Sequence, residues 1–76
     1  MNLNKNVSLN IMGISALDIR MIELIAQGLT YNEISAELNV IPSKAEGIRK
    51  KLIAKTHTKN AASLISFAYR FGLLKT

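Results

Sequence analysis

Cationic side chains are concentrated in one short segment of this 76-residue chain, between positions 44 and 55. The segment holds one acid, Glu46, against five basic residues: Lys44, Arg49, Lys50, Lys51 and Lys55. Lysine and arginine displace the counterions that condense on a phosphate backbone, so such a cluster is suited to binding nucleic acid. Gly47 lies in the same segment, where the lack of a side chain lets the backbone approach a ligand closely. This segment is therefore the first candidate binding surface.

The formal charge differs between the two halves of the chain. Residues 1–43 contain two basic and four acidic residues, whereas residues 44–76 contain eight basic residues and one acidic residue, within a total charge of +5. A basic region of this kind is typical of proteins that bind polyanions. The chain has no Cys and a single His, His57, which argues against disulfides and structural zinc and favours a reducing cytoplasm. We expect no cofactor.

Catalysis and membrane insertion have little support in the sequence. It contains no Gly-rich phosphate loop, no paired catalytic carboxylates and no metal-ligand spacing, and nothing forms a recognisable triad with His57. No apolar run approaches the roughly 18 residues of a membrane span. We therefore expect neither an enzyme with a small-molecule substrate nor a membrane protein. Residues 1–13 are polar and are interpreted as a flexible arm or linker before one domain at residues 14–76.

Four helices are expected to position the basic segment. The first, residues 16–27, begins after Ser15, whose side chain caps the helix while Asp18 reaches back to the cap. The second, residues 31–38, begins with a complete capping box formed by Thr30 and Glu33. These two helices carry most of the acidic residues, so they are expected to support the basic surface rather than extend it.

The third helix carries the basic residues and is expected at about residues 43–56. Pro42 suits its first turn because proline lacks the amide that a helix start leaves unpaired. Ser43 and Glu46 form a second candidate capping box one residue later, so two starting points remain open.

The fourth helix, residues 61–71, is expected to begin after Asn60 and to end before Gly72. Helical spacing predicts one apolar face for each of the four helices. The residues predicted to face the core are Leu17, Met21, Leu24, Ile25, Ile34, Leu38, Ala45, Ile48, Leu52, Thr56, Ala61, Leu64, Ile65, Ala68 and Phe71. Leu73 and Leu74 are expected to fold back against this core.

A short helix, a turn of three or four residues and a longer helix with a basic outer face are typical of the helix-turn-helix, whose second helix enters the major groove. Helix 31–38 and helix 43–56 fit this description. The outer face of the longer helix is predicted to contain small, polar and cationic residues: Ser43, Glu46, Gly47, Lys50 and Ala54, with Lys51 on its flank. The predicted fold class is thus all-α, with four helices and a short N-terminal arm.

The stretch IAQGLTYNEISAEL, from Ile25 to Leu38, resembles the "IA-x-G-x-(S/T)-x-x-EIA-x-x-L" stretch of the LuxR/FixJ-type DNA-binding domain. Domains of this family are the output domains of many bacterial response regulators and quorum-sensing regulators. The resemblance runs without gaps from Ile14 to Leu74, and the sequence departs from the family mainly in the third helix. Where the family usually has Thr-Val, His and Asn, this chain has Lys44-Ala45, Ile48 and Lys51. The usual operator preference of the family is therefore not implied.

The resemblance implies sequence-specific binding of double-stranded DNA by a cytoplasmic transcription regulator. It also implies an upstream receiver or sensor domain, as in two-component systems. The DNA contacts that it implies are Thr30, Tyr31, Asn32, Ser43, Lys44, Glu46, Gly47, Lys50, Lys51, Lys59 and Asn60. Helix 61–71 is the family's usual dimerisation element, and the positions that could form the seam of a homodimer are Ala62, Ser66 and Tyr69.

Several alternatives remain open from the sequence. The domain could be a degenerate helix-turn-helix that acts as a protein-interaction module, or a sigma-factor-like promoter-binding domain. Glu46 could be a capping carboxylate or an acceptor for a cytosine amine. Arg49 could contact a phosphate or form an internal ion pair with Glu33 or Glu37. Tyr69 and the two Phe residues near it are interpreted as core residues, with an interface as the alternative for Tyr69.

Overall fold

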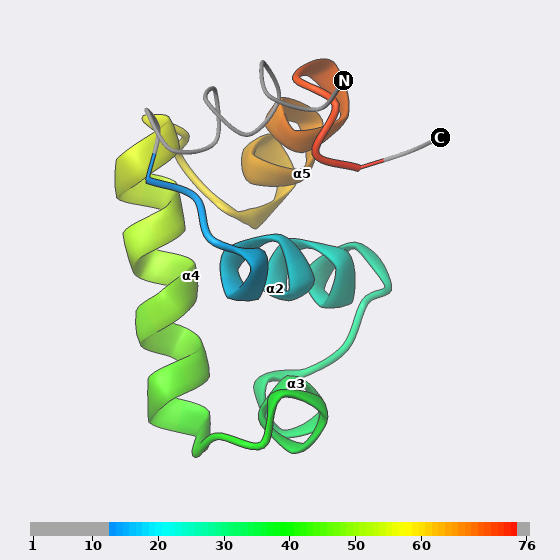
Figure 1. The fold of residues 1–76 in the computed structure, drawn as a ribbon, viewed down its shortest axis with the longest axis vertical. Helices are drawn as coiled ribbons and strands as arrows, with labels where there is room; N and C mark the ends of the chain where they lie inside the picture. Colours follow the sequence, from blue (N-terminus) through cyan, green and yellow to red (C-terminus); the bar gives the residue numbers. More distant parts are fainter. Residues whose placement is uncertain (1–12, 75–76) are drawn as a thin grey trace.

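The structure is a computed structural model that describes residues 13–74 and contains four α-helices in that range. The helices are α2 (Ala16–Ala26), α3 (Tyr31–Leu38), α4 (Pro42–Thr56) and α5 (Ala61–Arg70). In Figure 1, α4 stands upright along one side, α3 lies near its beginning, α5 near its end and α2 between them. The predicted all-α fold with four helices is confirmed. The arm predicted for residues 1–13 lies outside the described residues, except for Gly13.

Capping boxes start α2 and α3, as predicted. The Ser15 hydroxyl accepts from the Asp18 amide at 3.1 Å, and the Asp18 carboxylate accepts from the Ser15 amide at 3.0 Å. Thr30 and Glu33 exchange the same two bonds, at 3.2 and 2.8 Å. Because α3 has only eight residues, it depends on its cap and on its neighbours for stability.

The predicted second capping box at the start of α4 does not form. Pro42 is the first helical residue, and Ile41 occupies the N-cap position without a side-chain hydrogen bond. Ser43 and Glu46 are therefore inside the helix, and the Glu46 carboxylate lies 3.1 Å from the Lys50 ammonium instead. The fixed φ of Pro42 is already helical, which favours this start over the alternative, in which Ser43 would be the N-cap and Lys44 the first helical residue. Glu46 is thus not a capping carboxylate.

The cap of α5 is more complete than the sequence suggested. Asn60 accepts from the Ser63 amide at 2.9 Å, and the Ser63 hydroxyl accepts in return from the Asn60 amide at 3.0 Å. The helix ends one residue before the predicted end, and Phe71 is its C-cap. Gly72 then has a φ of +76°, which lets the chain turn back so that Leu73 and Leu74 pack against the core, as predicted.

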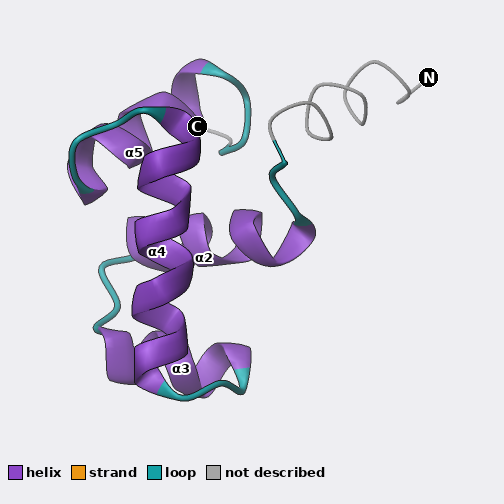
Figure 2. Ribbon diagram, turned by 90° about the vertical axis from the view of Figure 1, so that its left-hand side faces the viewer, coloured by secondary structure: helices purple, strands orange, loops and turns teal. Residues whose placement is uncertain are grey.

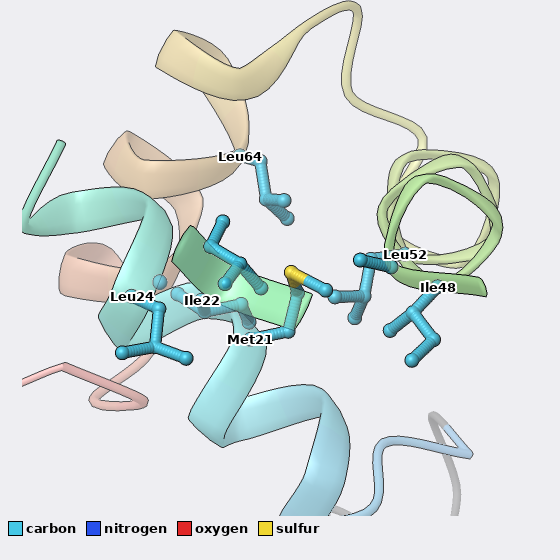
Figure 3. Close-up of a cluster of buried hydrophobic side chains, with 9 residues drawn as sticks. Met21, Ile22, Leu24, Ile48, Leu52 and Leu64 are labelled. Atoms are coloured by element: carbon cyan, nitrogen blue, oxygen red, sulfur yellow. The ribbon is translucent and has the colours of Figure 1, made fainter. Parts of the chain in front are cut away.

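The core lies where all four helices meet. Its buried residues are Met21, Ile22 and Leu24 from α2, Ile34 from α3, Ala45, Ile48 and Leu52 from α4, and Leu64 and Ala68 from α5. Figure 3 shows Met21 at the centre of this cluster, with Leu52 and Ile48 on one side and Leu64 above. Thr56 is also buried, and its hydroxyl donates to the Leu52 carbonyl at 2.8 Å. The inward face predicted for α4 is therefore confirmed.

Two residues predicted to face the core are exposed. Leu17 in the first turn of α2 is 41% exposed, and Phe71, the C-cap of α5, is 60% exposed. Tyr69, interpreted as a core residue, is 44% exposed, and the Phe71 ring instead stacks on Phe67 with 4.5 Å between centroids. Within residues 13–74, none of the helices is long and apolar enough to cross a membrane.

Candidate nucleic-acid interface

The outer face of α4 is open to solvent and carries cationic side chains. Lys44, Lys50 and Lys51 are all exposed. By helical spacing Lys50 lies opposite the buried residues of the same helix, with Lys44 and Lys51 on the flank of that face. Gly47 lies between them along the helix, and a Cβ built there would meet no heavy atom within 4 Å. The glycine is therefore not required by packing inside the domain. Because no side chain projects from the middle of the basic face, the backbone of α4 can come close to the floor of a DNA groove.

A short turn joins α3 to α4. Asn39 adopts a left-handed conformation with φ of 58°, and its amide donates to the Ala36 carbonyl, which ends α3. After Val40 and Ile41 the chain starts α4, so three residues separate the two helices. Asparagine tolerates this region better than most residues, which keeps the turn tight. The arrangement of α3 and α4 is consistent with a helix-turn-helix.

Lys55 is a basic residue of α4 whose ammonium group contacts other parts of the domain and is not available on the outer face. Its ammonium donates to the Gly13 carbonyl at 2.7 Å and to the Asp18 carboxylate at 3.1 Å. The Asp18 side chain is only 10% exposed and that of Lys55 35% exposed. Lys55 therefore ties the end of α4 to the start of α2, and its charge serves the fold. The cations of α4 that remain for a polyanion are Lys44, Arg49, Lys50 and Lys51.

The N-termini of α3 and α5 carry the remaining predicted contacts. Thr30, Asn32, Lys59 and Asn60 are exposed there, and Tyr31 is half-buried. Several amides at these ends are already occupied, since that of Thr30 donates to Glu33 and those of Lys59 and Asn60 donate to the Ser63 hydroxyl. The Glu33 and Ser63 amides are also taken, by the Thr30 and Asn60 side chains. What remains for phosphate is the first two amides of each helix, together with the Lys59 ammonium.

These two N-termini lie on the same side of α4. In Figure 2, with α4 toward the viewer, the connection from α2 to α3 and the first turn of α5 are both on its left. Thr30, Tyr31 and Ala61 line a common cavity with Arg49 of α4. The fold thus brings together the predicted contacts of α3, α4 and α5, although they come from three separate stretches of the chain.

Arg49 does not form either of the ion pairs that the sequence left open. The Glu37 carboxylate lies 3.4 Å from Arg20, and that of Glu33 accepts from Thr30. The Arg49 guanidinium instead lies over the Tyr31 ring, 5.6 Å from its centroid, and its buried Nε makes no hydrogen bond. The ion-pair alternative is wrong, because both carboxylates have other partners.

The predicted dimer residues form an exposed strip on α5. Ala62, Ser66 and Tyr69 all point away from the core, in contrast to Leu64 and Ala68 of the same helix. Small residues at the first two positions leave room for the close approach of a second helix, with a ring at the end of the strip. The strip has the form that a helix-to-helix contact requires, and the homodimer stays a prediction.

The sequence did not predict three tertiary features, namely two ion pairs and one cavity. The contact of Lys55 with Asp18 spans 37 residues, that of Arg20 with Glu37 spans 17, and the cavity beside Arg49 is formed by four helices. Nothing in the spacing of Asp18 and Lys55 indicates that they meet.

Comparison of the chain with models of protein families, with curated proteins and with solved structures finds no match.

Proposed function

We propose that this domain binds double-stranded DNA, with α4 in the major groove and the N-termini of α3 and α5 against the phosphate backbone. The observation that carries the proposal is the outer face of α4. Three exposed lysines surround a glycine whose missing side chain leaves an open approach, on the longer helix of a pair joined by a three-residue turn. A helix with these properties can bring its backbone close to base edges.

The distribution of charge supports this orientation. α4 carries five basic residues and one acid, whereas α2 and α3 together carry four acids and one basic residue, Arg20. A polyanion is attracted to the first surface and repelled by the second, so that electrostatic steering favours one docking orientation. A solvated basic face alone would not require the acidic residues to be gathered on the supporting helices.

We also infer that the domain belongs to the LuxR/FixJ type and acts as the output of a bacterial transcription regulator, as a homodimer through α5. The matched residues from Ile25 to Leu38 support this assignment, and so does the order of four helices ending in Gly72 and Leu73. The exposed strip of Ala62, Ser66 and Tyr69 supports the dimer. One domain of this size offers too little contact area to select a site among many in a genome, which a two-fold pair overcomes.

The test is a titration of labelled random-sequence duplex DNA by fluorescence anisotropy at several salt concentrations. If about four or five phosphates are neutralised by the cations of α4 and by Lys59, log K falls with log salt with a slope of about −4. Lys44, Lys50 and Lys51 replaced together by glutamine should abolish this binding without unfolding the domain, because all three are exposed.

The matched control replaces exposed residues of the same charge elsewhere. Arg20 and Arg70 lie outside α4, and their replacement by glutamine should weaken binding only slightly. Affinity that does not depend on salt, or equal losses for the α4 and control variants, would show that α4 is not the binding surface. Salt-sensitive binding to an acidic polypeptide, without binding to duplex DNA, would instead support the protein-interaction alternative.

A further inference from the structure

We propose that the cavity beside Arg49 receives a phosphate of the DNA backbone and that the Arg49 guanidinium is its cationic anchor. The cavity has a volume of about 330 Å³. Its walls are largely apolar and come from four helices and the loop between α2 and α3: Ile25, Leu29, Thr30, Tyr31, Ile34, Arg49 and Ala61. Arg49 is the single charged residue among them, so the cavity has a positive charge without a counter-charge.

The pairing of Arg49 is incomplete in the protein alone. Its Nε is buried and makes no hydrogen bond, and Arg49 takes part in none of the ion pairs of residues 13–74. A buried N–H without an acceptor opposes folding unless a ligand supplies one. An anion that arrives from outside would supply the acceptor that Arg49 lacks.

The surroundings of the guanidinium are arranged to hold it in place. It lies over the Tyr31 ring at 5.6 Å, a distance at which a cation is attracted to the face of an aromatic ring. A planar guanidinium held in this way presents its nitrogens as a fixed fork, which matches two oxygens of a phosphate. The Tyr31 ring thus acts on the anion through Arg49 and is a positioning residue.

A backbone phosphate fits this cavity better than a separate small anion. The cavity is lined by Thr30 and Tyr31 at the start of α3 and by Ala61 at the start of α5. Those two ends and the basic face of α4 are the surfaces assigned above to the DNA. The apolar walls can lie against a deoxyribose, which has few polar groups along its edge. The inference rests on the proposed function and adds to it an anchor that the charge pattern alone does not identify.

The experiment compares Arg49→Met with the wild type by DNA titration and by thermal unfolding. We expect at least a tenfold loss of affinity and a salt slope that is less steep by about 0.9, the value for one phosphate. We expect the melting temperature of the free domain to stay level or to rise, because a buried N–H without a hydrogen-bond partner has been replaced by an apolar group. A purely structural arginine would give the opposite change in stability.

Arg20→Met is the matched control, because it removes the same charge from a side chain that is 46% exposed and already paired with Glu23 and Glu37. It should change the affinity for DNA less than twofold. Arg49→Lys keeps the charge but loses the planar fork, so we expect the wild-type salt slope with an affinity several-fold weaker.

The outcomes separate the two proposals. If the wild type does not bind duplex DNA, the proposed function fails. If the wild type binds DNA and Arg49→Met binds it with the same affinity and the same salt slope, the function stands and the anchor is refuted. A nitrogen-15 spectrum of the Arg49 Nε–H gives a direct second measurement, with a shift expected on adding DNA. A saturable shift with benzoate but none with DNA would identify a small-carboxylate site and overturn the proposal.

Discussion

Gly47 makes the free domain less stable than it could be, and this offers a test of the proposed interface. The residue lies inside α4, its φ is not positive, and a Cβ there would meet nothing within 4 Å. Alanine can therefore replace it without strain, and the gain in helix propensity is about 0.5–1 kcal/mol. For a domain of this size such a gain raises the melting temperature by about 2–8 °C.

The same position should respond in the opposite sense when DNA binding is measured. Gly47→Leu adds a good helix former, so it should also stabilise the free domain, but its side chain would hold α4 away from the groove. We expect a loss of about 1–2 kcal/mol in binding, or roughly tenfold in affinity. Ala26→Leu is the matched control, since α2 ends at this exposed residue on the side away from α4 (Figure 1).

The measurements are urea or thermal unfolding by circular dichroism and DNA titration by anisotropy. If Gly47→Leu is as stable as expected and binds DNA as tightly as the wild type, the reasoning is refuted, because close approach of the backbone would not be needed. If Gly47→Ala is less stable than the wild type, the environment of the glycine has been described wrongly.

Three further predictions concern the ties and surfaces around α4. Asp18→Ala should lower the free energy of unfolding by about 2 kcal/mol, because both the Ser15 amide and Lys55 lose their acceptor. A loss in urea unfolding no larger than that of an exposed surface change would contradict it. Lys59→Ala should weaken binding to all DNA sequences alike, whereas Lys50→Ala should lose about 1–3 kcal/mol at one base pair of a selected site; equal losses on selected and random DNA would show that Lys50 does not read bases. Ala62→Glu should abolish cooperative filling of two half-sites while thermal stability stays unchanged; persistent cooperativity would place the dimer contact elsewhere.

Local rules predicted the starts of α2 and α3, because the two residues that form each capping box are close in sequence. The capping box of Thr30 and Glu33 joins residues three positions apart, so both halves are visible in the sequence. The start of α4 was harder, because Pro42 as the first helical residue and Ser43 as the N-cap are two different solutions, each supported by a local rule. The helix begins at Pro42, with Ile41 at the N-cap and no side-chain hydrogen bond there.

Periodicity predicted the buried residues in the middle of each helix and failed at the start of α2 and the end of α5. Ile48 and Leu52 are buried in the core cluster, whereas Leu17 and Phe71 have the right spacing but are exposed. Spacing reports which residues share a face and does not report how far the neighbouring helix extends. Phe71 also follows the last residue of α5, where the helical period no longer applies.

The candidate site shows the same division between local and tertiary information. Exposure of Lys44, Lys50 and Lys51 follows from the helix period, and the structure agrees. Whether Lys55 and Arg49 are paired inside the domain depends on which acidic residues the fold places next to them. The partner of Lys55, Asp18, is 37 residues away in sequence. An equal charge on the same helix therefore serves the fold in one case and, in our proposal, the ligand in the other.

The pair between Lys50 and Glu46 bears on how the proposed interface would read DNA. The two side chains are 3.1 Å apart and are 65% and 45% exposed, so that water screens the pair and its contribution to stability is about 0–1 kcal/mol. Exchanging this contact for a guanine edge or a phosphate therefore opposes binding only slightly. In the free domain the pair holds Lys50 along the outer face, which lowers the entropy lost when the side chain is ordered on DNA. Once Lys50 is released, the Glu46 carboxylate remains next to the groove as an acceptor. It would repel a phosphate placed there and favour a cytosine amine, so in the proposed interface Glu46 would contribute to sequence preference rather than to affinity.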